Sequence, residues 1–138
     1  MPPVLLHWDM IPAHAFRWPI TLQDQHFDAL EHVNNVVYVQ WVQEAAAAHW
    51  QTLSAARTVE VVWVVRRHEV DYLKPAFRGD ELTAYTWVGD TQGALSVRHV
   101  HILNQHGELL LHAQTTWCAL DKKKFRPMRI NEELIRIL

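Results

Sequence analysis

The sequence predicts an α+β domain in which one long helix packs on one face of a five-stranded antiparallel sheet. Apolar residues recur at helical spacing between Asn35 and about Ala56, after a single strand-like segment. Four later segments alternate apolar and polar residues, and turns rich in Gly, Asn and Pro join them. This order of one strand, one helix and four strands favours a two-layer α+β fold.

The composition indicates a single globular domain over residues 1–138. The chain is 49% apolar and has a formal net charge of −2, which suits one buried core and argues against a nucleic-acid-binding surface. It has no apolar run long enough to cross a membrane, and its start lacks the basic and apolar regions of a signal peptide. Cys118 is the one cysteine and fits a reducing compartment, so we expect a cytoplasmic enzyme.

The first part of the chain leads from an irregular arm into the helix. Residues 1–15 contain three prolines and predict a surface arm. Residues 16–23 predict a strand, and Pro19 indicates a sheet edge or a bulge because it has no N–H to donate. The valines after Asn35 favour a strand, but Trp41, Ala45 and Ala48 keep helical spacing. We expect a helix that is buried, because it is almost entirely apolar.

Four strands and a short helix are predicted for the rest of the chain. The strands are expected at residues 58–73, 81–88, 94–103 and 108–120, with hairpins at 89–93 and 104–107. A regular strand over 58–73 would be roughly 50 Å long, so it must bend, carry a bulge or extend into a partner. Residues 131–138 predict a helix capped by Asn131. An open sheet edge and an overlong strand together predict a dimer.

Residues 28–38 carry the clearest chemical signal in the chain. Asn is a favoured N-cap, so Asn34 or Asn35 is expected to begin the helix, with free N–H groups pointing back towards Asp28 and His32. Such N–H groups can polarise a carbonyl while a neighbouring acid attacks it, which is the arrangement of an acyl-transfer site. A capped connection between a strand and a helix explains the same residues without any chemistry.

Residues 26–38 resemble the N-terminal motif of hotdog-fold thioesterases, which reads D-x-D-x-x-G-H-V-N-N-x-x-Y. Asp28 matches the Asp that carries catalysis in the 4-hydroxybenzoyl-CoA thioesterase branch. Two positions depart from the motif, since His26 replaces the first Asp and Glu31 replaces the Gly. Plant acyl-ACP thioesterases have Asp, Asn and His at alternate positions of a similar segment, and here Leu30 replaces that Asn.

The resemblance extends over nearly the whole chain and implies a particular architecture. Residues 68–75 and 78–82 look like the second strand of the family and the turn after it, and the hairpin at Gly107 also matches. In such proteins the sheet wraps around the central helix, and the active sites lie between subunits. The resemblance therefore implies a homodimer or a tetramer built from two dimers.

The same resemblance implies roles for the motif residues. Asp28 is expected to attack the thioester carbonyl or to activate a water, and the backbone N–H near Asn35 is expected to polarise that carbonyl. His32 has three interpretations: it orients Asp28, binds the carbonyl, or hydrogen-bonds within the loop. The predicted substrate-binding set includes three neighbours of these residues: Val33, Asn34 and Tyr38.

Other charged residues allow two interpretations each. Arg66, Lys74 and Arg78 are predicted to bind the phosphates of CoA, although plain surface charge explains them equally well. Glu31 indicates either a turn that does not need the freedom of Gly or an acid recruited to the site. Glu44 is either a second acid of the site or the partner in a salt bridge between subunits.

No cofactor and no metal are expected. His99 and His101 share a strand face by the two-residue period, and His112 is expected on the neighbouring strand. Surface or subunit-facing histidines explain this better than a metal site, because no Cys pair accompanies them and residues 68–72 do not form an H-E-x-x-H motif.

The predicted function is hydrolysis of an acyl-CoA thioester to the free acid and CoA. An acyl-ACP thioesterase would differ only in the carrier, and a non-catalytic acyl-CoA-binding protein fits the departures at His26 and Glu31. Dehydratases and hydratases of the same fold use a D-x-N-P-x-H type motif, which this chain lacks. The predicted partners are therefore acyl-CoA or acyl-ACP and a second copy of the chain, with no nucleic acid and no membrane.

Overall fold

The computed structural model describes residues 11–138, and residues 1–10 of the predicted arm lie outside this part. The elements in chain order are β1 (Phe16–Ile20), a 3₁₀ turn η2 (Asp24–His26), α1 (Asn35–Ser54), β2 (Val61–Tyr72), β3 (Leu82–Gln92), β4 (Leu95–Leu103), β5 (Leu109–Asp121) and α2 (Glu132–Ile137). No helix within residues 11–138 combines the length and the apolar composition needed to cross a membrane.

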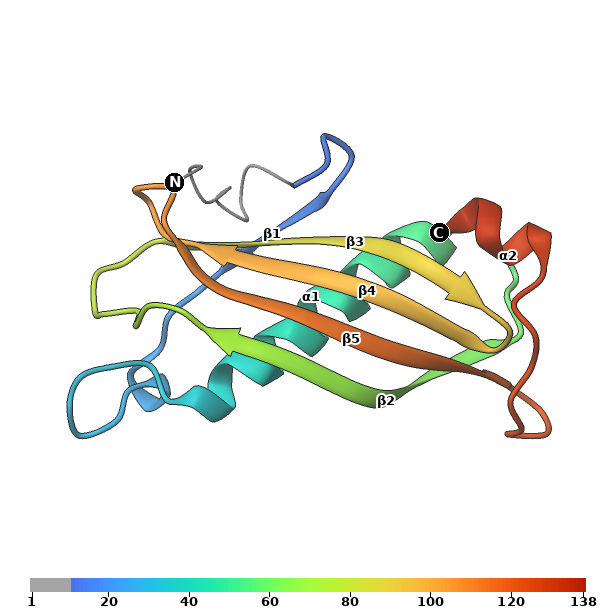
Figure 1. The fold of residues 1–138 in the computed structure, drawn as a ribbon, viewed down its shortest axis with the longest axis horizontal. Coiled ribbons are helices and arrows are strands. Elements are labelled where there is room, and N and C mark those ends of the chain that lie inside the picture. Colours follow the sequence, from blue (N-terminus) through green and yellow to red (C-terminus); the bar gives the residue numbers. More distant parts are fainter. Residues whose placement is uncertain (1–10) are drawn as a thin grey trace, which may run out of the picture.

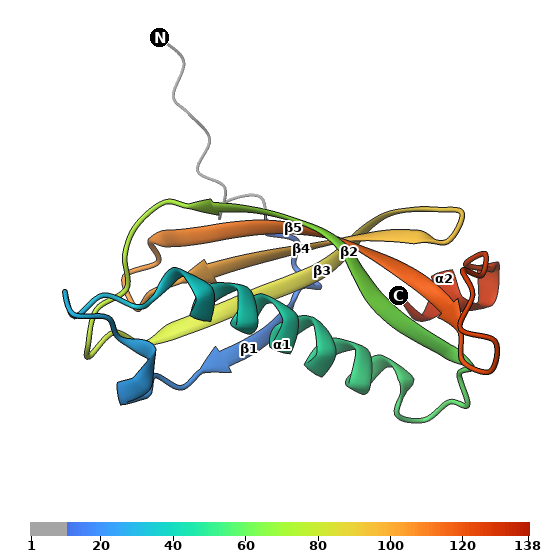
Figure 2. The ribbon, with the colours of Figure 1, turned by 90° about the horizontal axis from the view of Figure 1, so that it is seen from below.

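The five strands form one antiparallel sheet in the order β1-β3-β4-β5-β2. The sheet curves over α1, which lies along one face of it, and α2 lies near the end of the sheet that the C-terminal end of α1 approaches (Figures 1 and 2). The predicted α+β architecture is confirmed. Pro19 lies in β1, an edge strand, as its missing N–H predicted.

All five strands differ from their predicted bounds by one to four residues, and β1 ends at Ile20 where the prediction reached residue 23. Two of the strands, β2 and β3, also differ in a way that has a clear physical reason. β2 is irregular between Val65 and Arg67, which is the bulge that its length required. β3 continues through Gly89 to Gln92, so the predicted hairpin at 89–93 shrinks to a short turn at Gly93. Gly89 can stay in the strand because it lacks a side chain: a Cβ there would lie 2.6 Å from Nε2 of His99 on β4.

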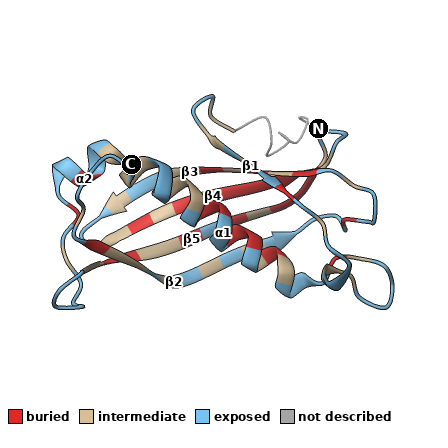
Figure 3. Ribbon diagram, turned by 180° about the vertical axis from the view of Figure 1, so that it is seen from behind, coloured by how far each residue is buried: buried red, intermediate tan, exposed pale blue. Residues whose placement is uncertain are grey.

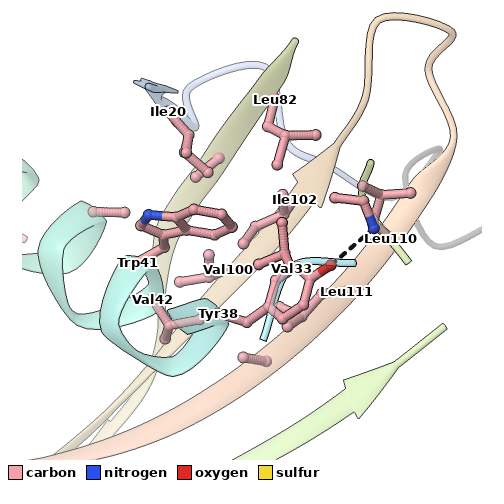
Figure 4. Close-up of a cluster of buried hydrophobic side chains, with 14 residues drawn as sticks. Ile20, Val33, Tyr38, Trp41, Val42, Leu82, Val100, Ile102, Leu110 and Leu111 are labelled. Atoms are coloured by element: carbon pink, nitrogen blue, oxygen red, sulfur yellow. Dashed lines mark hydrogen bonds between the residues drawn. The ribbon is translucent and has the colours of Figure 1, made fainter. Parts of the chain in front are cut away.

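The core lies between α1 and the middle of the sheet. Tyr38, Trp41 and Val42 of α1 pack against apolar residues of the central strands, among them Ile102 and Leu111 (Figure 4). Ala45 is fully buried, and its small side chain lets the sheet approach the helix closely. Within residues 11–138 nothing covers the side of α1 away from the sheet (Figure 3). The sequence predicted a buried helix, and the structure buries one face of it.

Candidate active site

The loop between Phe27 and Val33 is a tight turn closed by its own backbone. An isolated antiparallel bridge joins Phe27 to Val33, and the N–H of Asp28 donates to the carbonyl of His32 at 2.8 Å. The Asp28 side chain reinforces the turn, since its Oδ1 accepts from the N–H groups of Leu30 at 2.8 Å and His32 at 3.2 Å. One oxygen of this carboxylate thus fixes the loop.

The other oxygen of Asp28 is available for chemistry. Asp28 is exposed, and no donor within residues 11–138 pairs with its Oδ2. Hydrogen bonds from two backbone amides hold the carboxylate in one orientation. The Asp28 side chain therefore loses little further conformational entropy when Oδ2 acts on a substrate. A nucleophile or a general base needs such a held but unoccupied oxygen.

Asn34 is the residue that begins the helix. Its side chain accepts from the N–H of Val36 at 3.1 Å, and its carbonyl accepts from the N–H of Val37 at 2.9 Å. This decides between the two candidate caps, and it makes Asn35 the first helical residue. In the described part of the chain no acceptor pairs with the N–H of Asn35, so the backbone donor expected at this position is unoccupied.

Glu31 adopts the left-handed conformation, with φ of 62°. The turn therefore needs the positive φ that Gly supplies in the family motif, and the idea that it could do without that freedom is wrong. The Glu31 side chain is used as well, because its carboxylate accepts a hydrogen bond from Nε of Arg78. Backbone strain at this position is thus accompanied by an ion pair that only an acid can make.

Arg78 ties the loop to the preceding turn. Its Nη1 lies 2.7 Å from Oδ1 of Asp24, while its Nε binds Glu31. Its guanidinium carbon lies 4.3 Å from the ring centre of Phe27, which is a cation–π contact. The bonds to Glu31 and Asp24 raise the pKa of Arg78 above its ordinary value. The structure thus gives the arginine predicted to bind CoA two carboxylate partners of its own.

The other predicted site residues differ in their surroundings. His32 is half-buried and meets the ring of Phe77 edge-on at 5.0 Å. Val33 and Tyr38 are buried, and the Tyr38 hydroxyl accepts from the N–H of Ala76 at 2.9 Å, the dashed line in Figure 4. Burial raises the pKa of Tyr38. Val33 and Tyr38 therefore support the loop from beneath, whereas Asp28, Asn34 and Asn35 are exposed.

The remaining predicted cations lie on the surface. Lys74 makes an ion pair of 2.6 Å with Glu108, and this bond lowers the pKa of Glu108. Arg66 is exposed on β2, the edge strand. The structure brings neither of them into contact with Asp28 inside one chain.

Glu44 and His26 share a small cavity between β1 and α1. The cavity has a volume of about 300 Å³, and Trp41 and Gln40 also line it. His26 accepts at Nδ1 from the N–H of Gln23 at 3.0 Å, and Gln40 donates to Glu44 at 3.0 Å. The histidine that replaces the first Asp of the motif therefore stabilises the η2 turn.

The histidines of the sheet are arranged as the strand period predicted. His99 and His101 both contact the ring of Trp87, and the rings of His101 and His112 on neighbouring strands are 5.8 Å apart. Within the described residues, no three His, Cys, Asp or Glu side chains are grouped closely enough to hold a metal ion.

Sequence analysis missed a buried arginine, Arg98, beneath the C-terminal half of α1. It donates to Nδ1 of His49 at 2.8 Å and to the hydroxyl of Thr86 at 3.2 Å. One signal was present: Arg98 has the same strand parity as Val100 and Ile102, which predicts that it faces the core with them.

Comparison with known proteins identifies relatives over nearly the full chain. The family model described as the acyl-ACP thioesterase N-terminal domain matches residues 13–138. The acyl-CoA thioester hydrolase YbgC of Escherichia coli O6:H1 is 27% identical over 87% of this chain and 92% of its own. The long-chain acyl-CoA thioesterase FadM of Escherichia coli K12 is 25% identical over 83% of this chain and 90% of its own.

Solved structures share the fold. The thioesterase of Thermus thermophilus, crystallised with coenzyme A and zinc, superposes with a TM-score of 0.77 over 88% of this chain and 89% of that one. The two sequences are 23% identical, so this match bears on the fold alone. The fold expected from the resemblance, the hotdog fold, is thereby confirmed.

Proposed function

The chain belongs to the family of the acyl-ACP thioesterase N-terminal domain, and from this premise we propose that it hydrolyses acyl-CoA thioesters to the free acid and CoA. The observation that carries the proposal is that two polar groups without hydrogen-bond partners in the described residues lie at the same loop. These are Oδ2 of Asp28 and the N–H of Asn35 at the start of α1. Oδ2 can act on the carbonyl carbon. The N–H can donate a hydrogen bond to the carbonyl oxygen as negative charge develops on it.

Asp28 has two possible modes of action in this proposal. As a nucleophile, its Oδ2 bonds to the carbonyl carbon, the C–S bond breaks, CoA leaves as the thiolate, and water then hydrolyses the mixed anhydride. As a general base, Asp28 takes a proton from a water that attacks the same carbon. The anchored Oδ1 serves either mode, because it keeps Oδ2 in place through the reaction.

The positive end of α1 supports the negative charge of the transition state. The first N–H groups of a helix are free, and the dipole of the helix favours an anion there. The contact would be made by the backbone of Asn35, so the side chain at this position is free to vary. The proposed roles of Val33 and Tyr38 are to shape this turn, and His32 would orient the loop through its packing on Phe77.

A homodimer, or a tetramer of two dimers, completes the site in this proposal. Among residues 11–138, β2 pairs with β5 alone, so its other edge offers unpaired backbone groups to a second copy. Large apolar residues are exposed on β2 and around the loop, among them Leu30 and Val36, each 74% exposed. Val64 and Tyr72 are exposed on β2, the edge strand. A partner would cover these apolar residues and bring its own cations, such as Arg66, towards the thioester.

The carrier is CoA in this proposal, and ACP is the second candidate. The curated relatives cited above are named as acyl-CoA enzymes, whereas the matching family is described by acyl-ACP. Arg66, Lys74 and Arg78 are the cations proposed for the phosphates of CoA. Cys118 is a buried free thiol, which fits a protein of the reducing cytoplasm.

The deciding experiment measures thiol release from short, long and aromatic acyl-CoAs by the wild type and by Asp28→Asn. The amide keeps an oxygen that can accept from Leu30 and His32, so the loop is retained while the acid is lost. We expect kcat/KM to fall by about 100-fold or more. The matched control is Asp90→Asn, an exposed acid at the far end of β3, which should leave the rate unchanged.

Four other outcomes would contradict parts of the proposal. Hydrolysis that survives in Asp28→Asn would move the chemistry to Glu31, His32 or Glu44. Activity on acyl-ACP alone would replace CoA as the carrier, and binding of acyl-CoA without turnover would leave a non-catalytic protein. Sedimentation equilibrium tests the assembly: a monomeric wild type would overturn the dimer, and Val64→Lys is expected to weaken it.

A further inference from the structure

A cavity of about 310 Å³ lies between the C-terminal half of α1 and the sheet. This is a volume in the lower range of small-molecule sites. Its walls are mostly apolar and include Ala46 and Trp50 of α1, Trp63 of β2 and Trp117 of β5. The cavity is at the opposite end of α1 from the Asp28 loop, so it is distinct from the proposed catalytic groups within one chain.

Arg98 brings a positive charge into this apolar cavity. It is only 6% exposed, yet it is one of the residues that line the space. Its hydrogen bonds within residues 11–138 both leave from Nη1, one to His49 and one to Thr86. No carboxylate of residues 11–138, that of the chain end included, lies within ion-pairing distance of it. Nε and Nη2 therefore keep donors that the described protein does not use.

Neither of the two partners neutralises Arg98. His49 accepts at Nδ1 and stacks on Phe16 with 4.9 Å between ring centres. Burial, then the charges of Arg98 and His14, lower its pKa to about 4, so its imidazole is neutral at pH 7. Burial also lowers the pKa of Arg98 to about 10, which leaves it protonated at pH 7. A buried charge with only neutral partners is costly, and it is unusual in a site without a ligand.

Two more donors beside the cavity lack acceptors. The indole nitrogens of Trp63 and Trp117 are buried and have no hydrogen-bond partner among the described residues. Because these nitrogens are buried behind the cavity wall, the unused donors that a ligand in the cavity can reach are those of Arg98. An apolar wall with a single cation and spare N–H groups is complementary to a ligand that has an apolar body and an anionic end.

We propose that this cavity binds an acyl group whose far end carries a carboxylate, and that Arg98 forms the ion pair with that carboxylate. The inference rests on the proposed thioesterase function and on the proposed dimer, and it adds the substrate class, the CoA thioesters of dicarboxylic acids. The aliphatic part of the acyl group lies against Trp50, Trp63 and Trp117, which bury its methylenes. The free N–H groups of Arg98 form a fork that fits the two oxygens of a carboxylate.

Within one chain, His49 beside Arg98 lies about 21 Å along α1 from Asn35, farther than an eight-carbon acyl group reaches. Val61 and Trp63 of the cavity wall lie on β2, whose open edge would pair with the second copy, so the thioester carbonyl would react at the Asp28 loop of that copy.

The first test compares octanoyl-CoA with the CoA thioester of octanedioic acid, which has the same chain length and a carboxylate at its far end. We expect the wild type to favour the dicarboxylic thioester in kcat/KM, because it alone can pair with Arg98. Arg98→Met should lower kcat/KM for the dicarboxylic thioester by about 10- to 100-fold and leave octanoyl-CoA unchanged or better. Arg17→Met, an exposed arginine on β1, is the matched control and should alter neither. The inference is overturned if the wild type has the same kcat/KM for both thioesters and Arg98→Met does as well.

The second test does not need turnover. Binding of both thioesters to Asp28→Asn is followed by the fluorescence of the cavity tryptophans, and tighter binding of the dicarboxylic thioester should vanish when Arg98→Met is added. If no thioester is hydrolysed by the wild type, the proposed function fails, while this binding difference still decides the inference. Arg98→Gln repeats the test with a polar side chain in case Arg98→Met does not fold.

Binding of free octanoate tests whether Arg98 binds the carboxylate at the far end of an acyl group or the carboxylate of the free acid that hydrolysis releases. Octanoate binding that depends on Arg98, with no preference between the two thioesters, would show that the cavity takes the free acid and would overturn the inference. Loss of the oligomer in Arg98→Met, measured by sedimentation, would show that the arginine pairs with a carboxylate of a second copy, and would overturn it too.

Discussion

Arg78, beside the Asp28 loop, and Arg98, beneath the C-terminal half of α1, stand in opposite surroundings. Arg78 is exposed and binds two carboxylates, those of Asp24 and Glu31. Arg98 is buried, and its partners among residues 11–138 are a neutral histidine and a hydroxyl. The exposed arginine has its counter-charges and stabilises a strained turn. The buried one has none among residues 11–138, as expected of a group that a ligand completes.

The two ends of α1 also differ in how well they are packed. Trp41, near the Asp28 loop, is buried in the main core and touches His26 and Tyr38, whereas Trp50 is part of the wall of the cavity. The molecule is therefore rigidly packed where the chemistry is proposed, and open where the acyl group is proposed to bind.

The largest expected effect tests this difference in packing. Trp41→Ala should lower the free energy of unfolding by about 3–5 kcal/mol, because it empties a closely packed site. Trp50→Ala should cost less, by about 1–2 kcal/mol, since its neighbours already border a cavity. Urea unfolding followed by circular dichroism measures both, and equal losses would contradict the comparison.

Replacement of each arginine by Met should have opposite effects. Arg98→Met should raise the free energy of unfolding in the absence of ligand by about 1–2 kcal/mol, because it removes a buried charge that nothing neutralises. Arg78→Met should lower it only slightly, because its ion pairs are exposed and screened by solvent. Thermal unfolding of the two variants beside the wild type checks the signs. A less stable Arg98→Met would mean that His49 and Thr86 compensate the charge.

The pH dependence of stability should report the neutral state of His49. Its pKa is lowered from 6.5 to about 4 in the folded protein, first by burial, so the unfolded chain binds the proton more readily. Its contribution is present above pH 6.5 and is lost as the pH falls from 6.5 towards 4, by about 1–2 kcal/mol after allowance for partial exposure. His49→Gln should flatten this part of the curve, and an unchanged slope would contradict the assignment.

The smallest effect concerns the strained turn. Glu31→Gly and Glu31→Ala both remove the bond to Arg78, so the difference between them isolates the backbone at φ of 62°. Gly should be more stable than Ala at this position by about 1 kcal/mol, because it adopts a positive φ without a steric penalty. Equal stabilities of the two variants would mean that the turn relaxes when Arg78 is released.

Much of the fold followed from local patterns. The alternation of residues 108–120 predicted β5, and Pro19 predicted an edge strand, because both rules act on neighbouring residues of one strand. Asn131 predicted the start of α2 in the same way, as its side chain accepts from the N–H of Leu134 at 2.8 Å. At the site, the sequence predicted a capped helix start, and the structure assigned the cap to Asn34.

What only the tertiary structure decided depends on residues far apart in the chain. Glu31 takes a conformation suited to Gly while Arg78, from another turn, binds its side chain. β3 continues through Gly89 because His99 of β4 occupies the space where a side chain would be. Arg98 has no counter-charge among residues 11–138, because the segments of α1 and of the three strands that surround it there bring no carboxylate. Local rules specify where a helix or strand begins, but the surroundings of a charge depend on which distant segments pack around it.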